Sequence, residues 1–258
     1  MSKNVALVLG SGGARGLAHI GAIEALEERG YTITSIAGCS MGSIIAGMYA
    51  AGQLKEAKEW FLRVDKQLIL RMMDINLLSG NSLVKGQRII EELKTVVPDQ
   101  PIEKLRIPCT LIASDMLHTE EVVFRSGSLF DAVRASISIP LFFQPVQMGK
   151  RLLIDGGIMS PLPLHAVERT EGDILVASDI SGKDGMSYDS RINFVRILDR
   201  MNDMQIQQNT ILECQLYPPD VHAVMRQYAY NTFDFDKANE IIEEGKRIMT
   251  EALEQYEN

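Results

Sequence analysis

Residues 33–48, with the sequence ITSIAGCSMGSIIAGM, constrain the fold of this chain more than any other segment. They open with the β-branched residues of a short strand, pass through a tight turn bounded by Gly38 and Gly42, and continue from Ser43 as an apolar stretch of helical character. Glycine at both ends lets such a turn approach neighbouring backbone, while the serine at its centre, Ser40, projects outward. The segment predicts a strand, a turn and a helix with Ser40 as a candidate nucleophile; the alternative is an incidental serine in a small-residue turn.

A similar unit begins the chain. Residues 5–9 form an apolar run typical of a strand buried on both faces, and the glycine-rich loop GSGGARG follows at once. From Leu17 onward, apolar residues recur at helical spacing until Gly30 ends the pattern. The order predicts a strand, a loop and an amphipathic helix.

The N–H groups of this glycine-rich loop lie where the start of a helix favours negative charge. They could bind a dinucleotide pyrophosphate, stabilise the oxyanion of an acyl-transfer intermediate, or simply form a tight turn. A dinucleotide site requires G-x-G-x-x-G and an acidic residue at the end of the second strand. From Gly10 the spacing is G-x-G-x-x-x-G, and the second strand runs into Ser40 without a carboxylate, so the oxyanion hole is favoured.

A carboxylate stands at a comparable position later in the chain. Asp155 ends the apolar run at 152–154 and is followed by Gly156 and Gly157. The ends of strands are where α/β proteins place their active groups, and a carboxylate within reach can accept a proton from serine. Asp155 is therefore the candidate proton acceptor, with a surface turn of the Asp-Gly type as the alternative. The ends of these three strands could meet at one edge of a parallel sheet.

The composition limits the class of protein. A chain of 258 residues with 46% hydrophobic residues can bury the core of a single α/β domain spanning 1–258, although two domains are also compatible. The net charge of −8 argues against a nucleic-acid partner. Three widely spaced cysteines predict neither a disulfide framework nor a zinc site, and the carboxylates lack calcium-loop spacing, so no metal or other cofactor is expected.

The lengths of the apolar runs, beginning with the one near the N-terminus, indicate where in the cell the protein is expected. The N-terminal run, VALVL, is too short for the core of a signal peptide, and later apolar stretches break well before the roughly 18 residues that a membrane span needs. We expect a cytoplasmic protein that is not secreted by a signal peptide. Peripheral contact with the inner membrane surface stays open, as does the oligomeric state.

Residues 60–100 are rich in leucine, isoleucine and methionine, including Met72 and Met73. Such a stretch is often core. Because flexible thioethers suit a wall that adapts to acyl chains, the segment is also a candidate lid or substrate wall. Ser82 could cap a helix that runs to about Val96.

The remaining pattern alternates strands and helices. Strands are expected at residues 109–113, 121–124 and 174–177, and helices from about 128, at 193–214 and at 235–256. A polar loop is expected at 183–191. No internal repeat or low-complexity linker marks a domain boundary.

Taken together, the motifs resemble those of the bacterial members of the patatin-like phospholipase family. The resemblance covers essentially the whole chain, because the glycine loop, the serine turn, the Asp-Gly-Gly motif and the closing helix have that family's order and spacing. The motifs are residues 12–16, 38–42, 135–140, 155–157 and 233–245. The family's loop is usually G-x-G-x-x-G, and Ser11 stands at the position of its first glycine.

The resemblance implies a three-layer α/β/α fold with a mostly parallel central sheet. It further implies that Ser40 attacks an ester carbonyl, that Asp155 is the other member of a catalytic dyad, and that N–H groups around Gly12, Gly13 and Ala14 form the oxyanion hole. The expected function is hydrolysis of acyl esters of (lyso)phospholipids or related lipids through an acyl-Ser40 intermediate. The expected partner is a lipid or other acyl-ester substrate.

Two other classes stay open, an acyltransferase of related fold and a non-catalytic nucleotide-binding protein. Malonyl-type acyltransferases typically carry histidine immediately before the nucleophile, where this chain has Cys39. They also hold the substrate carboxylate with an arginine, for which Arg134 and Arg151 are speculative candidates.

The four histidines are His19, His118, His165 and His222. Structural or surface roles are favoured for each of them. A Ser-Asp-His triad that uses His165 or His222 ranks below the dyad.

Overall fold

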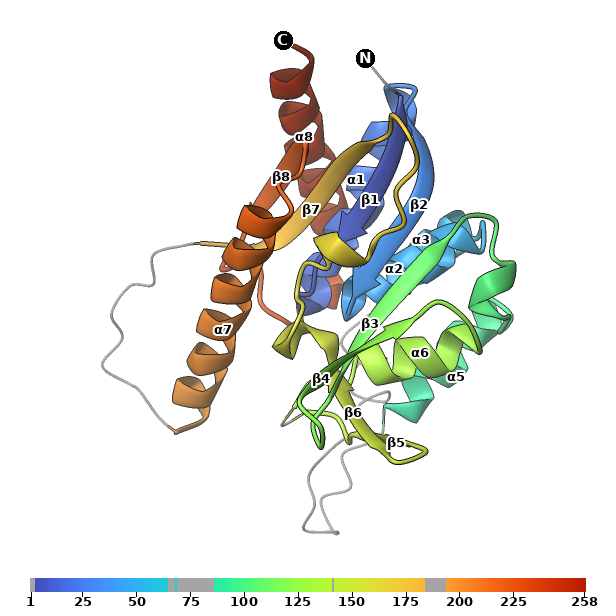
Figure 1. The fold of residues 1–258 in the computed structure, drawn as a ribbon, viewed down its shortest axis with the longest axis vertical. Coiled ribbons are helices and arrows are strands. Elements are labelled where there is room, and N and C mark those ends of the chain that lie inside the picture. The colour runs from blue at the N-terminus through green and yellow to red at the C-terminus, as the bar shows by residue number, and fades with distance from the viewer. Residues whose placement is uncertain (1–2, 65–67, 69–85, 141, 184–193) are drawn as a thin grey trace.

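A computed structural model describes residues 3–64, 68, 86–140, 142–183 and 194–258, and its centre is one mixed β-sheet (Figure 1). The strands are β1 (Asn4–Leu9), β2 (Thr32–Cys39), β3 (Cys109–Asp115), β4 (Glu120–Phe124), β5 (Val146–Met148), β6 (Arg151–Asp155), β7 (Ile174–Gly182) and β8 (Val221–Arg226). The α-helices are α1 (Ala18–Glu28), α2 (Met41–Ala50), α3 (Leu54–Phe61), α5 (Gln87–Val96), α6 (Leu129–Ser136), α7 (Phe194–Leu216) and α8 (Ala238–Glu257). Strands and helices alternate along most of the chain, as the sequence predicts.

The strand order is β5-β6-β3-β2-β1-β7-β8, with β4 paired to β3 beside this path. The five strands from β3 to β8 in this order are mutually parallel, which confirms the prediction of a mostly parallel sheet in an α/β fold. The expectation that the Asp155 strand belongs to the parallel set is wrong, because β6 pairs antiparallel with β3. The strand that ends at Asp155 therefore runs in the opposite direction to β2, the strand that precedes Ser40.

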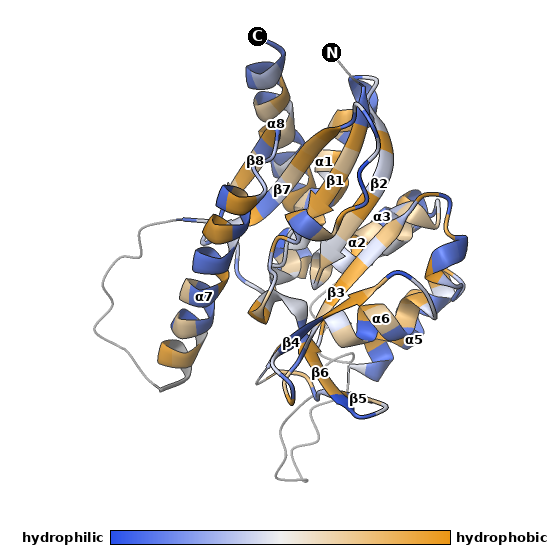
Figure 2. Cartoon of the chain, viewed as in Figure 1, coloured by the Kyte–Doolittle hydropathy of each residue, from blue (hydrophilic) through white to orange (hydrophobic). Residues whose placement is uncertain are grey.

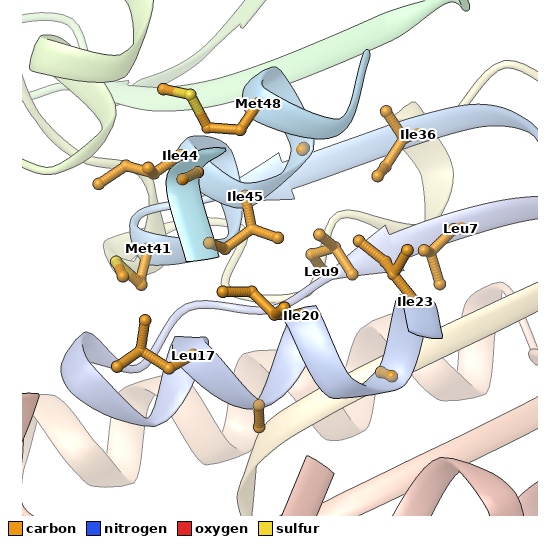
Figure 3. Close-up of a cluster of buried hydrophobic side chains, with 14 of the residues drawn as sticks. Leu7, Leu9, Leu17, Ile20, Ile23, Ile36, Met41, Ile44, Ile45 and Met48 are labelled. Carbon is orange, nitrogen blue, oxygen red and sulfur yellow. The ribbon is translucent and has the colours of Figure 1, made fainter. Parts of the chain in front are cut away.

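One face of the sheet carries most of the core. Leu7 and Leu9 of β1 and Ile36 of β2 point to this face and pack against apolar side chains of α1 and α2, as Figure 3 shows. Helix α8 closes the same layer through its extensive contact with α1. All three labelled strand residues are fully buried, so this layer holds both strands, and the turn after β2, in place.

The other face is covered more thinly. Ala6 and Val8 of β1 point there and pack against Leu162 and Leu164, while Cys214 of α7 adjoins the cluster. Helices therefore lie on both faces of the sheet, and α7 belongs to the smaller layer. Figure 2 shows mostly hydrophobic residues along β1 and β7, in keeping with burial on both faces.

Several elements differ from the sequence expectation at their ends. Helix α2 begins at Met41 rather than Ser43, directly after the serine turn. The sequence patterns above predict no strand at the position of β8, whose side chains alternate between buried and exposed positions, as in a strand with one solvated face. Helix α5 begins after Gly86, whose φ of 66° only glycine adopts readily.

Some expectations fall on residues that are not described. Ser82, Met72, Met73 and most of the predicted loop at 183–191 lie outside the described residues. The interpretation of the chain as a single domain stays a prediction. Within the described residues, no helix combines the length and hydrophobicity needed to cross a membrane.

Candidate active site

Ser40 lies at a sharp turn between β2 and α2. Its φ is 54° and its ψ is −123°, a conformation that is strained for a residue with a side chain. The glycines on both sides make the turn tight: a Cβ on Gly38 would lie 2.8 Å from the Ser43 nitrogen, and one on Gly42 would lie 2.8 Å from the Gly10 oxygen. The predicted strand–turn–helix is therefore present, and its geometry depends on both glycines.

Hydrogen bonds hold the strained backbone of Ser40 on both sides. Its N–H donates to Ser136 Oγ at 2.8 Å, and its carbonyl accepts from Ser43 Oγ at 2.6 Å and from the Ser43 N–H at 2.9 Å. Sequence reasoning assigned no role to Ser136 or Ser43. Ser136 lies within the 135–140 motif, and that motif is the feature of the sequence that could have indicated a role for Ser136 at the site.

Asp155 meets Ser40 at the end of β6. Ser40 Oγ donates a hydrogen bond of 2.5 Å to Asp155 Oδ2, and both residues are at least 95% buried. The second carboxylate oxygen, Oδ1, accepts from the N–H of Gly157 at 2.7 Å, and the Asp155 N–H donates to the Ser138 carbonyl. The carboxylate therefore has a fixed orientation toward the serine hydroxyl.

Burial changes the acidity of this carboxyl. Loss of solvation raises the pKa of Asp155 from 3.8 to about 6, against the lowering effect of hydrogen bonds from Ser40 and Gly157. A carboxylate with a raised pKa is a stronger base, yet it is still mostly ionised at neutral pH. Asp155 can therefore accept a proton from a neighbouring hydroxyl.

The two glycines after Asp155 allow close packing around it. A Cβ on Gly156 would lie 2.9 Å from Cys39 Sγ, and one on Gly157 would lie 2.6 Å from Ser11 Oγ. A larger residue at Gly156 would press on β3 and the end of β2, and one at Gly157 would press on Ser11 of the glycine-rich loop and on the Asp155 carboxylate.

The glycine-rich loop passes beside Ser40, and three of its N–H groups are already bonded to carbonyls. Gly10 donates to Ser178, Ser11 to Pro161, and Ala14 to Thr232 at 2.8 Å. Ala14 is thus not a free donor in this structure, contrary to the expectation that it contributes to an oxyanion hole.

Two donors of the loop remain. Within the described part of the chain, the N–H groups of Gly12 and Gly13 have no hydrogen-bond acceptor, and both glycines line a pocket that also contains Ser40. Two neighbouring donors next to a serine hydroxyl suit a single oxygen atom that carries negative charge.

The segment after β8 fixes this loop, a contact with no signal in the sequence. Besides the bond from Ala14 to Thr232, the buried Arg15 side chain donates to the carbonyls of Gln227 at 2.7 Å and Tyr230 at 3.0 Å. Gly13, with a φ of 58°, packs so closely on Thr232 that a Cβ would lie 2.6 Å from its carbonyl oxygen.

Ser40 lies between two pockets of different character. One is almost wholly apolar on its walls and also contains Gly13 and Thr232. Its apolar lining is Met41, Ile44, Trp60, Phe61, Val64, Ile89, Leu93, Ile137, Ile139, Phe143, Phe233 and Phe235. Five of these residues belong to the 60–100 segment, so its described part forms one wall of the pocket.

The second pocket is more polar. It contains Asp155 and Arg15 and is bounded on one side by Asn202, Asp203 and Ile206 of α7. The hydroxyl of Ser40 is thus reached from an apolar side and from a polar side.

The four histidines make their hydrogen bonds away from Ser40. His19 is buried between Ser178 Oγ and the Gly10 carbonyl, and burial lowers its pKa to about 4. The others bond to carboxylates: His118 to Asp115, His165 to Glu121 and Glu213, and His222 to Asp179. In the described residues, no imidazole bonds to the serine or to Asp155.

The two arginines considered for an acyltransferase both have partners in the protein. Arg134 donates to Ser138 Oγ at 2.6 Å and to the Gln144 carbonyl, and Arg151 forms an ion pair with Asp115.

Within the described residues, no three His, Cys, Asp or Glu side chains are grouped as metal ligands.

The site combines a strained serine turn, an adjacent buried carboxylate and a glycine loop with two N–H groups that have no acceptor among the described residues. These features define an α/β protein with a serine-hydrolase type of site. A family model described as "Patatin-like phospholipase" matches residues 7–167, which is more than half of the chain. The chain belongs to the patatin-like phospholipase family.

Similar proteins agree with this membership. An uncharacterized NTE family protein of Mycobacterium tuberculosis is 42% identical over 193 residues, covering 74% of this chain and 53% of that protein. Patatin-like phospholipase domain-containing protein 6 of Mus musculus is 32% identical over 189 residues, covering 70% of this chain and 14% of that protein. This chain thus spans about half, or less, of the length of these relatives.

A solved structure supports the fold. VipD from Legionella pneumophila superposes with a TM-score of 0.54 over 98% of this chain and 67% of that chain, at 15% sequence identity. The likeness extends beyond the region that the family model matches and includes α7, β8 and α8.

Proposed function

We propose that this protein hydrolyses acyl esters of (lyso)phospholipids or related lipids through an acyl-Ser40 intermediate. The observation that carries the proposal is the 2.5 Å hydrogen bond from Ser40 Oγ to the buried Asp155 carboxylate, next to an apolar pocket. A serine hydroxyl needs an adjacent base to become a nucleophile, and Asp155 is positioned as that base.

In the first half-reaction, Ser40 Oγ attacks the ester carbonyl while Asp155 Oδ2 takes the hydroxyl proton. The tetrahedral intermediate collapses to acyl-Ser40, and the proton passes from Asp155 to the leaving alcohol. In the second half-reaction, a water molecule attacks the acyl group and gives its proton to Asp155. Collapse releases the fatty acid and returns that proton to Ser40 Oγ, so that one carboxylate serves both steps.

The N–H groups of Gly12 and Gly13 are the donors that we assign to the oxyanion. Donors of this kind stabilise the charge that develops in the transition state, and loss of one costs about 3 kcal/mol. The bond from Ala14 to Thr232 and the anchoring of Arg15 keep the loop in place before substrate arrives.

The two pockets favour a lipid as substrate. The apolar pocket, with aromatic and branched side chains such as Trp60 and Phe143, suits an acyl chain. The polar pocket with Asn202 and Asp203 suits the alcohol portion of the ester. We propose that the described part of the 60–100 segment acts as a substrate wall.

The same geometry weighs against the two alternatives. A pyrophosphate needs several free N–H groups, whereas Gly10, Ser11 and Ala14 already donate to protein carbonyls. An acyltransferase of the malonyl type would use a histidine and an arginine at the nucleophile, and the described candidates for both are bonded elsewhere.

The test is an ester panel with the wild-type chain and Ser40→Ala. We expect the wild type to hydrolyse long-chain lipid esters and to react with a fluorophosphonate probe, while the variant loses labelling and at least about a thousandfold in turnover. Labelling that persists in Ser40→Ala would refute the assignment of the nucleophile.

A further inference from the structure

The segment 158–160, which follows the proposed base and its two glycines, is bonded to side chains of α7. The Gln205 amide donates to the Ile158 carbonyl at 2.7 Å. The Asn209 amide donates to the carbonyls of Ile158 at 3.1 Å and Met159 at 3.3 Å. Among the described residues, no backbone N–H donates to either carbonyl, so α7 supplies the hydrogen bonds that a helix or sheet would otherwise provide.

The two amides belong to one row on the helix. Gln205, Asn209 and Glu213 are four residues apart, and this spacing places them on the same side of α7. Glu213 Oε1 accepts a hydrogen bond from Ser160 Oγ at 3.4 Å and is bonded to His165 Nδ1 at 2.8 Å. We call Gln205, Asn209 and Glu213 the α7 row. Its three members contact the segment one after another.

The two ends of the segment have different anchors. At its near end, the Gly157 N–H donates to Asp155 Oδ1 at 2.7 Å and so helps to orient the carboxylate toward the serine hydroxyl. Directly after its far end, the Pro161 carbonyl accepts from the N–H of Ser11 at 2.8 Å. The far end keeps this second anchor if the α7 row is removed. The α7 row therefore controls chiefly the near end, where the carboxylate lies.

An amide is well suited to hold a chain segment beside a catalytic base. It donates a hydrogen bond without adding a cation, whereas a lysine or arginine in its place would lower the pKa of Asp155 and weaken it as a base. Other residues of α7, Asn202, Asp203 and Ile206, line the polar pocket. The amides of the α7 row thus act on the site from behind the turn and not by touching substrate.

We propose that Gln205 and Asn209 are positioning residues that hold the Asp155 carboxylate against Ser40 by fixing residues 158–160. The proposal rests on the proposed function, in which Asp155 is the base. A displacement of about 1 Å at a reacting group can cost about a hundredfold in rate. Reacting groups keep their geometry only where surrounding packing and hydrogen bonds hold them, and here the hydrogen bonds come from α7.

Kinetics on a water-soluble ester test this inference. The double variant Gln205→Leu with Asn209→Leu keeps side chains of similar size but removes both donors. We expect kcat to fall about tenfold or more while KM stays within about twofold, because the α7 row acts on the base and not on substrate binding. The matched control is Gln208→Leu, at an exposed position of the same helix, which should keep the wild-type kcat.

Urea unfolding identifies the conditions in which each variant is folded during the assay. If the double variant does not fold, Gln205→Leu alone, at an exposed position, should still lower kcat by about threefold or more. An unchanged kcat in the folded variant, or a change in KM alone, would overturn the proposal.

A double-mutant cycle separates positioning from a general effect on the fold. In an Asp155→Asn background, the two leucine substitutions should lower the residual turnover by less than about twofold, because the α7 row acts through that carboxylate. An equal loss in both backgrounds would show that the α7 row does not act through Asp155.

An NMR titration tests the same role without any substrate. Burial is the main cause of the raised pKa of Asp155, about 6, and release of the segment would admit water to the carboxylate. We expect the Asp155 carboxyl, followed by carbon-13 NMR, to titrate at least about one pH unit lower in the double variant than in the wild type. Equal values would overturn the positioning role, whether or not the chain hydrolyses esters. A wild-type chain without esterase activity would refute the proposed function separately.

Discussion

Cys39, the last residue of β2, and Asp155, the last residue of β6, lie opposite Ile112 and Ala113, two successive residues of β3. Both lie on the same edge of β3, because β4 occupies the other edge along both residues. Strands β2 and β6 therefore meet end to end with opposite directions. This meeting places Ser40, which follows Cys39, against the Asp155 carboxylate.

The first prediction concerns coupling between these two groups. Asp155→Asn preserves shape but removes the proton acceptor, so turnover should fall nearly as far as in Ser40→Ala. The double variant should be little worse than either single one, because the two residues act as a unit. Kinetics of all three variants on one soluble ester measure the coupling, and additive losses would contradict it.

The second prediction is a pH dependence. Because Asp155 must be ionised to accept a proton and burial raises its pKa to about 6, kcat/KM should fall tenfold per pH unit well below pH 6 and level off above it. A pH–rate profile on a soluble ester measures this. A profile whose acid limb lies near pH 4 would show that Asp155 is not the titrating base.

A third prediction links the same shift to stability. The folded-state pKa of Asp155 is raised, so its contribution to the free energy of unfolding is present below about pH 4 and is lost as pH rises through about 6. The ionised form should cost up to about 3 kcal/mol at pH 8. Asp155→Asn should therefore stabilise the protein at pH 8 more than at pH 4, as compared by urea unfolding.

Asparagine can keep both contacts in that experiment, with its oxygen toward the Gly157 N–H and its amide toward Ser40. A variant that is less stable than wild type at both pH values would mean that lost hydrogen bonding outweighs relief of the buried charge.

The fourth prediction concerns the glycine-rich loop, to which we assign the oxyanion donors. Gly13→Ala adds a Cβ that meets the Thr232 side chain and carbonyl at 2.6 Å, at a φ of 58°, and should lower kcat by about a hundredfold or more. Gly30→Ala is the matched control, since Gly30 has a φ of 78° but open space around it. The control should lose roughly 1 kcal/mol of stability and keep its activity. Equal activity of the two variants would exclude the loop from catalysis.

The fifth prediction separates a dyad from a triad. Glutamine in place of His118, His165 or His222, one at a time, should leave ester hydrolysis within about tenfold of wild type, a barrier change of about 1.4 kcal/mol or less. His19 is kept unchanged, because its bonds to Gly10 and Ser178 support the glycine loop. A thousandfold loss at any of the three would refute the dyad.

Local patterns in the sequence determined much of this protein. The apolar run of β1 predicted a strand buried on both faces, the β-branched residues of β2 predicted a short strand, and the glycines around Ser40 predicted the tight turn. All three features depend on residues close together in the chain. The same holds for Asp155, whose place at the end of an apolar strand before two glycines marked it as a candidate base.

Only the tertiary structure decided how these pieces meet. The period of two along a strand is the same for parallel and antiparallel pairing, so the apolar pattern of β6 could not show that it runs opposite to β3. Likewise, Ala14 and Thr232 are too far apart in sequence for any local pattern to reveal that one N–H is already bonded. Those long-range contacts fix which carboxylate faces Ser40 and which N–H groups of the loop have no acceptor among the described residues, because both depend on strand pairing and loop packing.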